Sequence, residues 1–135
     1  MHPLRNLAFL VGRFLIAGVF IYDAYIIVRT QGGTTSYIAT SGLPDHIGGV
    51  PLALVVALCQ VVGGIMIVFG FWTRLAALAF AAFCVATAVL FHRNLGSTDV
   101  TIQAGKDLAT AGGFLFLAAA GPGGWSLDAR ARRDL

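Results

Sequence analysis

The chain has 135 residues, enough for one domain, and hydrophobic residues make up 58% of it while charged residues make up 11%. A soluble globular domain carries about 25% charged residues, so this composition excludes an ordinary water-soluble surface and favours lipid as the solvent. The net charge is +3, and part of it lies in a short Arg-rich tail, Arg130–Arg133. No basic stripe with interleaved aromatic residues is present, so nucleic acid is not an expected partner.

The first apolar segment runs from about Leu7 to Val28 and is long enough to cross roughly 30 Å of hydrocarbon. It is too long for the apolar region of a signal peptide and contains Arg13, so we predict a retained membrane helix. The same segment contains Asp23. A charge at membrane depth costs roughly 2.5–3.5 kcal/mol, so each of these two residues requires a compensating interaction.

A polar connection follows, from Arg29 to about Gly49, in which 34–39 has the composition of a short interfacial helix with a hydroxyl cap. The second span is predicted at about Val50–Phe71, with Pro51 in its first turn. The very short connection after it predicts that the second and third spans form an antiparallel hairpin.

The third span is predicted at about Leu75–Phe91, after the connection Trp72–Arg74. A second polar connection precedes the fourth span, at about Ala104–Ala120. Glycine and proline at Gly121–Gly124 end that span, because glycine suits a helix C-cap and proline cannot continue the helix.

These elements predict an all-α integral membrane protein: one domain, residues 1–135, forming an antiparallel four-helix transmembrane bundle with a basic tail at 125–135. Small residues at helix-packing spacing, such as Ala77 and Ala81, would let the helices approach closely. Basic residues are more numerous on the side that holds both termini and the Trp72–Arg74 turn, so we predict that both termini are cytoplasmic. The expected location is the cytoplasmic (inner) membrane of a bacterium, as a multi-pass protein.

Arg13 and Asp23 are separated by about 15 Å of helix and cannot pair with each other. By depth, Arg13 would pair with Asp128, if the tail folds back under the bundle. Asp23 would find Lys106, Arg93 or His92 at the external ends of the third and fourth spans. We favour structural ion pairs that pin the two ends of the bundle, and the alternative is a polar cavity for an anionic or proton-carrying ligand.

Three further side chains have both a structural and a functional interpretation. His92 has a pKa near neutrality and could exchange protons with a quinone, although an interfacial histidine bonded to a loop carbonyl is the simpler interpretation. Gln60 is expected to hydrogen-bond across helices or to hold a ligand carbonyl. Cys59 and Cys84 are expected to be packing residues, and the sequence does not decide whether they face each other. No histidines stand at metal-ligand spacing, so no metal site is expected.

Several short motifs occur in an order and spacing that resemble the DoxX family of small four-helix membrane proteins. The motifs extend nearly from end to end: Gly12-Arg13, Gly42-Leu43-Pro44, Gly63-Gly64, Gly70-Phe71-Trp72-Thr73-Arg74, Phe91-His92, Lys106-Asp107, Gly112-Gly113 and Gly121-Pro122-Gly123-Gly124-Trp125-Ser126-Leu127-Asp128. The resemblance places Arg13, His92, Lys106 and Asp128 on the family's recurring polar positions. The chain departs from the family at Asp23, where members often have a nearby lysine, and at Asp107, where members often have asparagine.

The DoxX family is named from a membrane component of an archaeal thiosulfate:quinone oxidoreductase, and its relatives are linked to membrane-associated oxidoreductase assemblies. The resemblance therefore implies a quinone- or redox-linked membrane subunit, with a quinone as the candidate cofactor and Asp23, His92, Lys106 and Gln60 as the candidate ligand site. The alternative is a non-catalytic accessory subunit of a larger membrane complex. In both cases the expected partners are the lipid bilayer and other membrane subunits or further copies of this chain. A small transporter fits less well, because broken helices and inverted repeats are missing from the pattern.

Overall fold

A computed structural model describes residues 3–30, 42–44, 46–91 and 98–132 of the chain. Its long helices are α1 (Pro3–Arg29), α3 (Leu52–Phe69), α4 (Thr73–Phe91) and α5 (Thr98–Ala120). The shorter elements are β1 (His46–Ile47), β2 (Val50–Pro51) and α6 (Leu127–Ala131). The prediction of an all-α membrane bundle is confirmed, while the short helix predicted at 34–39 lies outside the described residues.

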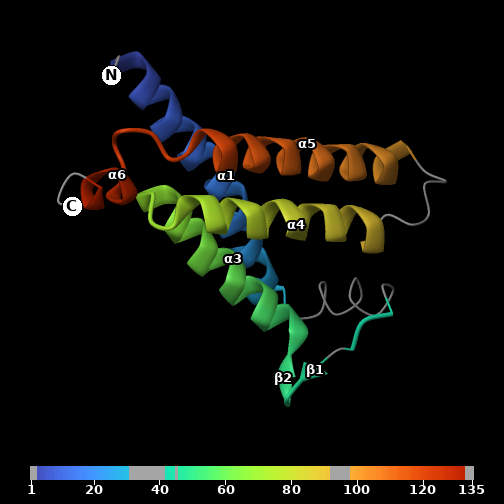
Figure 1. Cartoon of the computed structure of the whole chain (residues 1–135). Coiled ribbons are helices and arrows are strands. Elements are labelled where there is room, and N and C mark those ends of the chain that lie inside the picture. The colour runs from blue at the N-terminus through green and yellow to red at the C-terminus, as the bar shows by residue number, and fades with distance from the viewer. Residues whose placement is uncertain (1–2, 31–41, 45, 92–97, 133–135) are drawn as a thin grey trace.

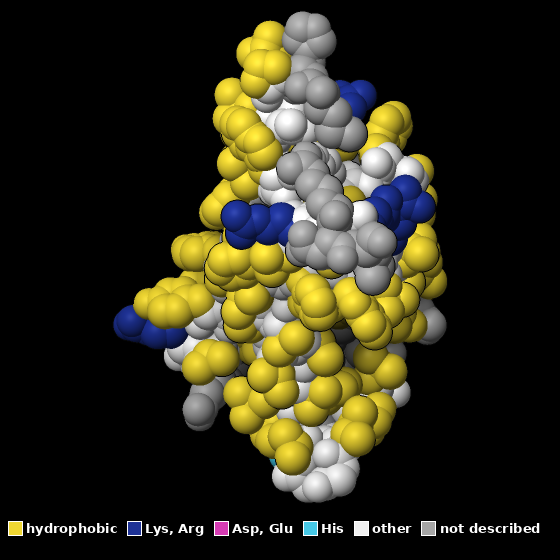
Figure 2. Space-filling view, turned by 60° about the vertical axis from the view of Figure 1, so that its left-hand side comes forward, with side chains coloured by type: hydrophobic (Ala, Val, Ile, Leu, Met, Phe, Trp, Pro, Cys, Tyr) yellow, Lys and Arg dark blue, Asp and Glu magenta, His cyan; other side chains and the backbone are white. Residues whose placement is uncertain are grey.

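Three of the long helices, α1, α3 and α4, are long and apolar enough to cross a membrane. α5 has 23 residues, which also suffices at 1.5 Å per residue, but Asp99, Lys106 and Asp107 make it more polar than the other three. The outer surface fits a lipid environment, since Phe116 of α5 is 80% exposed. Hydrophobic side chains cover most of the face seen in Figure 2, and Lys and Arg side chains are few there.

The long helices associate as two antiparallel pairs, α1 with α3 and α4 with α5, and the pairs cross each other (Figure 1). This corrects the expected hairpin of the second and third spans, because α3 and α4 diverge from their connection. The reason lies in the backbone of that connection, where Gly70 and Trp72 both have positive φ angles, of 70° and 46°. These left-handed residues turn the chain so sharply that α4 leaves at an angle to α3.

An aromatic cluster joins the two pairs where they cross. The ring of Phe20 in α1 lies 4.7 Å from Phe80 in α4 and 5.4 Å from Phe114 in α5, measured between centroids. The rings of Phe80 and Phe114 are stacked at 5.0 Å. Aromatic contacts of this kind add about 0.5–1.5 kcal/mol each beyond the burial of their surface. The crossing is therefore the packed centre of the bundle.

Glycines permit the closest helix contacts. A Cβ atom added to Gly64 of α3 would lie 2.8 Å from Ile21 of α1, and one added to Gly63 would lie 2.6 Å from Phe80 of α4. At these distances an added side chain would force Ile21 or Phe80 to move, so glycine at both positions permits the close packing of α3 against α1 on one side and α4 on the other.

A two-stranded hairpin precedes α3, with His46 opposite Pro51 and Ile47 opposite Val50. Gly48 and Gly49 form its turn with positive φ angles, as a tight hairpin turn requires. The expected start of the second span at Val50 is therefore two residues early. Pro51 precedes the first residue of α3 in an extended conformation, and the helix begins at Leu52.

Candidate functional site

Asp23 and Gln60 form a polar pair between α1 and α3. The Nε2 atom of Gln60 donates a hydrogen bond of 2.9 Å to Oδ2 of Asp23. Gln60 is 2% exposed, whereas Asp23 lies on the exposed surface of α1. The Oε1 atom of Gln60 is also buried, and it has no hydrogen-bond partner in the described part of the chain. The pair thus presents a carboxylate at the surface and an unpaired acceptor behind it.

The other residues of the predicted site lie elsewhere or outside the description. Lys106 is exposed on α5, and its backbone carbonyl accepts a 2.8 Å hydrogen bond from Oγ1 of Thr110. No hydrogen bond or ion pair joins Lys106 to Asp23 within residues 3–30 and 98–132. His92 and Arg93 lie outside the described residues. Of the four predicted ligand residues, the structure therefore brings Asp23 and Gln60 together.

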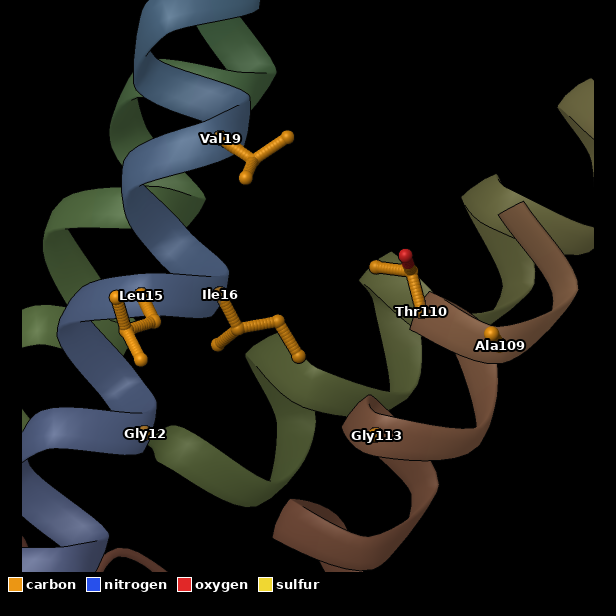
Figure 3. Close-up of a pocket in the computed structure, with 7 residues that line it drawn as sticks. All are labelled: Gly12, Leu15, Ile16, Val19, Ala109, Thr110 and Gly113. Carbon is orange, nitrogen blue, oxygen red and sulfur yellow. The ribbon is translucent and has the colours of Figure 1, made fainter. Parts of the chain in front are cut away.

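A shallow apolar groove of about 380 Å³ lies between α1 and α5 (Figure 3). Ile16 points toward Gly113, and Val19 and Thr110 lie on opposite sides of the open space. The full lining consists of residues from these two helices: Gly12, Leu15, Ile16, Val19, Ala109, Thr110 and Gly113. Ligand sites of about 300–1,000 Å³ are common in proteins, so the groove is large enough to hold part of a small molecule.

The opposite end of α1 contains a buried cation. Arg13 is 1% exposed, and its Nη2 atom donates a hydrogen bond to the backbone carbonyl of Trp125. Its Nε and Nη1 atoms have no hydrogen-bond partner among the described residues. Arg13 was expected to pair with Asp128. In the structure Arg13 and Asp128 are close enough to attract each other electrostatically, but the hydrogen bond of Arg13 goes to the backbone of the tail.

The carboxylate of Asp128 holds the start of α4. Its Oδ1 atom accepts a 2.9 Å hydrogen bond from the backbone N–H of Trp72. Its Oδ2 atom accepts two more from Thr73, from the backbone N–H at 3.0 Å and from Oγ1 at 2.9 Å. Burial alone raises the pKa of Asp128, but the hydrogen bonds from Thr73 and Trp72 and the nearby charge of Arg132 outweigh it, so the pKa lies below its usual value.

The tail between α5 and α6 packs against the same end of the bundle. The backbone N–H of Gly124 donates a 3.1 Å hydrogen bond to Oδ1 of Asn6, and the N–H of Asp128 donates one of 2.9 Å to the carbonyl of Gly70. Gly70 itself admits no side chain, since an added Cβ would collide with Arg13 and Ser126. The tail thus locks α1 to the connection between α3 and α4.

Sequence reasoning missed several members of this cluster. Thr73 offered a signal, because a hydroxyl residue at the start of a helix is a preferred cap position. The carbonyl of Trp125 and the amide of Asn6 offered no signal. Every residue has a backbone carbonyl, and a single asparagine near a terminus belongs to no motif that would predict its partner.

The thiols and the metal-binding residue types form no shared site within the described residues. Cys59 is exposed and Cys84 is buried, so the two thiols lie in different environments, and both are free. No group of three His, Cys, Asp or Glu side chains is close enough to hold a metal ion in the described ranges.

Comparison with known proteins identifies the family of this chain. The DoxX family model matches residues 8–93. The chain belongs to the DoxX family. The match extends over α1, α3 and α4, and so includes Arg13, Asp23 and Gln60.

Two curated proteins from Escherichia coli (strain K12) are similar to this DoxX chain over nearly its whole length. The inner membrane protein YqjF is 38% identical over 128 residues, which is 95% of each chain. The inner membrane protein YphA is 32% identical over 133 residues, covering 93% of this chain and 91% of its own. No solved structure matches the chain. The relatives extend the likeness beyond the family-model match, across α5 and the tail.

Proposed function

We propose that this DoxX protein is a membrane subunit of an oxidoreductase assembly in the bacterial inner membrane, and that it binds a quinone beside Asp23 and Gln60. Both E. coli relatives are named as inner membrane proteins, which supports the location. Quinone reduction or oxidation requires an electron-transfer partner, so a partner subunit is part of the proposal. The role of this chain is to bind and orient the quinone and to contact that partner.

The hydrogen bond between Gln60 and Asp23 is the observation that carries the proposal. It leaves Oε1 of Gln60 as a buried acceptor without a partner, and such a group costs about 1–3 kcal/mol. The hydroxyl group of a hydroquinone would satisfy this atom. The carboxylate of Asp23 would accept the second hydroxyl or its proton, and Lys106 is a further candidate from the sequence. His92 remains a candidate proton-exchanging group from the sequence.

The test is to purify the protein from native membranes in mild detergent and to quantify the extracted quinone per protein. We expect quinone to copurify with the wild-type chain. Gln60→Leu removes both polar atoms at similar size, so retention should fall about tenfold, as expected for losing a hydrogen bond worth up to ~1.5 kcal/mol. Asp23→Asn should also lower retention.

Gln103→Leu is the matched control, because Gln103 is an exposed amide on α5 and its loss should leave retention unchanged. Equal retention in wild type and Gln60→Leu would exclude this site. A wild-type preparation without quinone would exclude quinone binding altogether.

A non-catalytic accessory subunit is the second candidate, and the outer face of α4 favours it. Ala82 and Ala86 are exposed at helix-packing spacing in a shallow groove that also contains Leu78 and Val85. Small residues at this spacing let a partner helix approach closely in a membrane. Ala82→Leu would then release a partner protein that copurifies with the wild type, while quinone retention would stay unchanged.

A further inference from the structure

We infer that Arg74, Arg130 and Arg132 form a binding site for an anionic phospholipid, whose phosphate group lies where α6 meets the start of α4. The site is at the end of the bundle away from Asp23 and Gln60. It goes beyond the proposed function, because it follows from how the tail packs and does not depend on quinone binding.

The packing of the tail brings the three arginines to one place. The carboxylate of Asp128 in α6 binds the backbone N–H of Thr73, which is the residue before Arg74. Arg130 and Arg132 follow Asp128 within four residues, and the charge of Arg132 acts on the Asp128 carboxylate. All three arginines are exposed. The tail therefore gathers cations that lie far apart in the chain onto one surface.

The positive charge of this surface has little compensation from the protein. Asp128 is the one carboxylate in the described residues of the α3–α4 connection, the tail and α6. Its oxygens already accept three hydrogen bonds from Trp72 and Thr73, and it also attracts the buried Arg13. On the α6 side of the molecule, Figure 2 shows Lys and Arg side chains but no Asp or Glu side chain of the described residues. An anion from outside the chain would supply the missing negative charge.

Exposed aromatic side chains place this surface at the level of the lipid head groups. Trp72 is 61% exposed and Trp125 is 51% exposed. The ring of Phe71 is stacked on Trp72, with 5.9 Å between the centroids. Tryptophan is enriched where the hydrocarbon of a membrane meets water, and the phosphate groups of phospholipids lie at the same level. An acidic protein would match the arginines alone, whereas a phospholipid matches both the arginines and the indole rings.

Arginine side chains suit a phosphate group in particular. A guanidinium group donates parallel N–H bonds that match two phosphate oxygens, and such charge-assisted bonds are stronger than neutral ones. Phosphatidylcholine also has a phosphate, but it brings a cationic group that the arginines would repel. The surface therefore favours a lipid of net negative charge, such as phosphatidylglycerol.

The test is to titrate the purified full-length chain in mild detergent with phosphatidylglycerol and with phosphatidylcholine of the same acyl chains. Native mass spectrometry counts the bound lipids. We expect the wild type to bind phosphatidylglycerol more tightly than phosphatidylcholine. Arg130→Gln should weaken phosphatidylglycerol binding about fivefold, the usual effect of one basic residue near an anionic membrane surface. Binding of phosphatidylcholine should be unchanged.

A double variant and a matched control make the test specific. Arg74 also lies over Gly121 at the end of α5, so its replacement changes packing as well as charge. Arg130→Gln combined with Arg132→Gln tests the site without that change, and it should weaken phosphatidylglycerol binding more than Arg130→Gln alone. Arg29→Gln is the control, because Arg29 is an exposed arginine at the other end of α1.

The possible outcomes decide for or against the site. Equal affinity of the wild type for the two lipids would overturn the inference, and so would equal phosphatidylglycerol binding by the double variant and Arg29→Gln. A copurifying acidic protein that the double variant releases, with phosphatidylglycerol binding unchanged, would show that the surface binds a protein instead. Quinone retention should be the same in wild type and the double variant, so this inference and the proposed function fail independently.

Discussion

At the scale of single residues, the Asp128 carboxylate accepts the first backbone N–H groups of α4 from a position 55 residues further along the chain. Helix termini leave their first N–H groups without intrahelical partners, so a side chain that accepts them stabilises the fold. In this protein the acceptor arrives with the tail, which also supplies the carbonyl that binds Arg13. The Asp128 carboxylate therefore joins the tail to the connection between α3 and α4.

We predict that Asp128→Ala lowers the free energy of unfolding by about 1–3 kcal/mol, because the N–H groups of Trp72 and Thr73 lose their acceptor. Asp128→Asn should have a smaller effect, since its amide oxygen still accepts. Thermal unfolding in mild detergent measures the difference. Asp99→Ala is the control, because Asp99 is exposed on α5. Equal thermal unfolding midpoints for Asp128→Ala and Asp99→Ala would refute the proposed stabilisation of the start of α4 by Asp128.

The pKa of Asp128 gives this stabilisation a pH dependence. The folded-state pKa lies below that of the unfolded chain, so the stabilising contribution is fully present above the unfolded value and is lost as the pH falls through the folded value. The difference in unfolding midpoint between wild type and Asp128→Ala should therefore be large at neutral pH and shrink in strong acid. A difference in unfolding midpoint between wild type and Asp128→Ala that stays constant from neutral pH into strong acid would contradict this explanation.

At the scale of whole helices, the contact between α1 and α3 depends on the absence of a side chain at Gly64. We predict that Gly64→Ala destabilises the protein by about 1–3 kcal/mol, because the added methyl group collides with Ile21. Ile21→Ala removes the colliding atoms, so the double variant should be more stable than the sum of the two single effects. Additive effects in a double-mutant cycle would show that the helices are not in close contact there.

At the scale of the whole molecule, the basic residues determine the predicted orientation. The start of α1, the α3–α4 connection and α6 lie at one end of the molecule (Figure 1). These segments contain Arg5, Arg74 and Arg130. By the positive-inside rule, this end faces the cytoplasm. A fluorescent-protein fusion at the C-terminus should fluoresce, and a C-terminal alkaline phosphatase fusion should be inactive. The same reporters inserted at Gly48 should give the reverse pattern, and the opposite result at either site would refute the orientation.

The sequence predicted the helices better than it predicted their packing partners. The apolar segments and the glycine-proline stop after Ala120 placed most ends of the long helices within about four residues, because length and hydropathy act locally. The largest difference is the start of α5, at Thr98 where the sequence predicted Ala104, because the polar residues of its first two turns gave no apolar signal. The short connection at Trp72 indicated a hairpin, but the left-handed residues Gly70 and Trp72 send α4 away from α3. The backbone angles of a three-residue turn depend on what packs around it, and that information is not local.

The sequence by itself determined that this is a membrane protein, because its charged residues are too few to cover a surface in water. The order of apolar and polar residues along the chain predicted four long segments. The residue motifs predicted the DoxX family, and the comparison with known proteins confirmed it. Only the tertiary structure decided that Gln60 is the partner of Asp23, that the tail carbonyl of Trp125 is the partner of Arg13, and that α1 faces α5 across an open groove. These facts join residues far apart in the chain, and their distances follow from how two helix pairs cross around Phe20, Phe80 and Phe114.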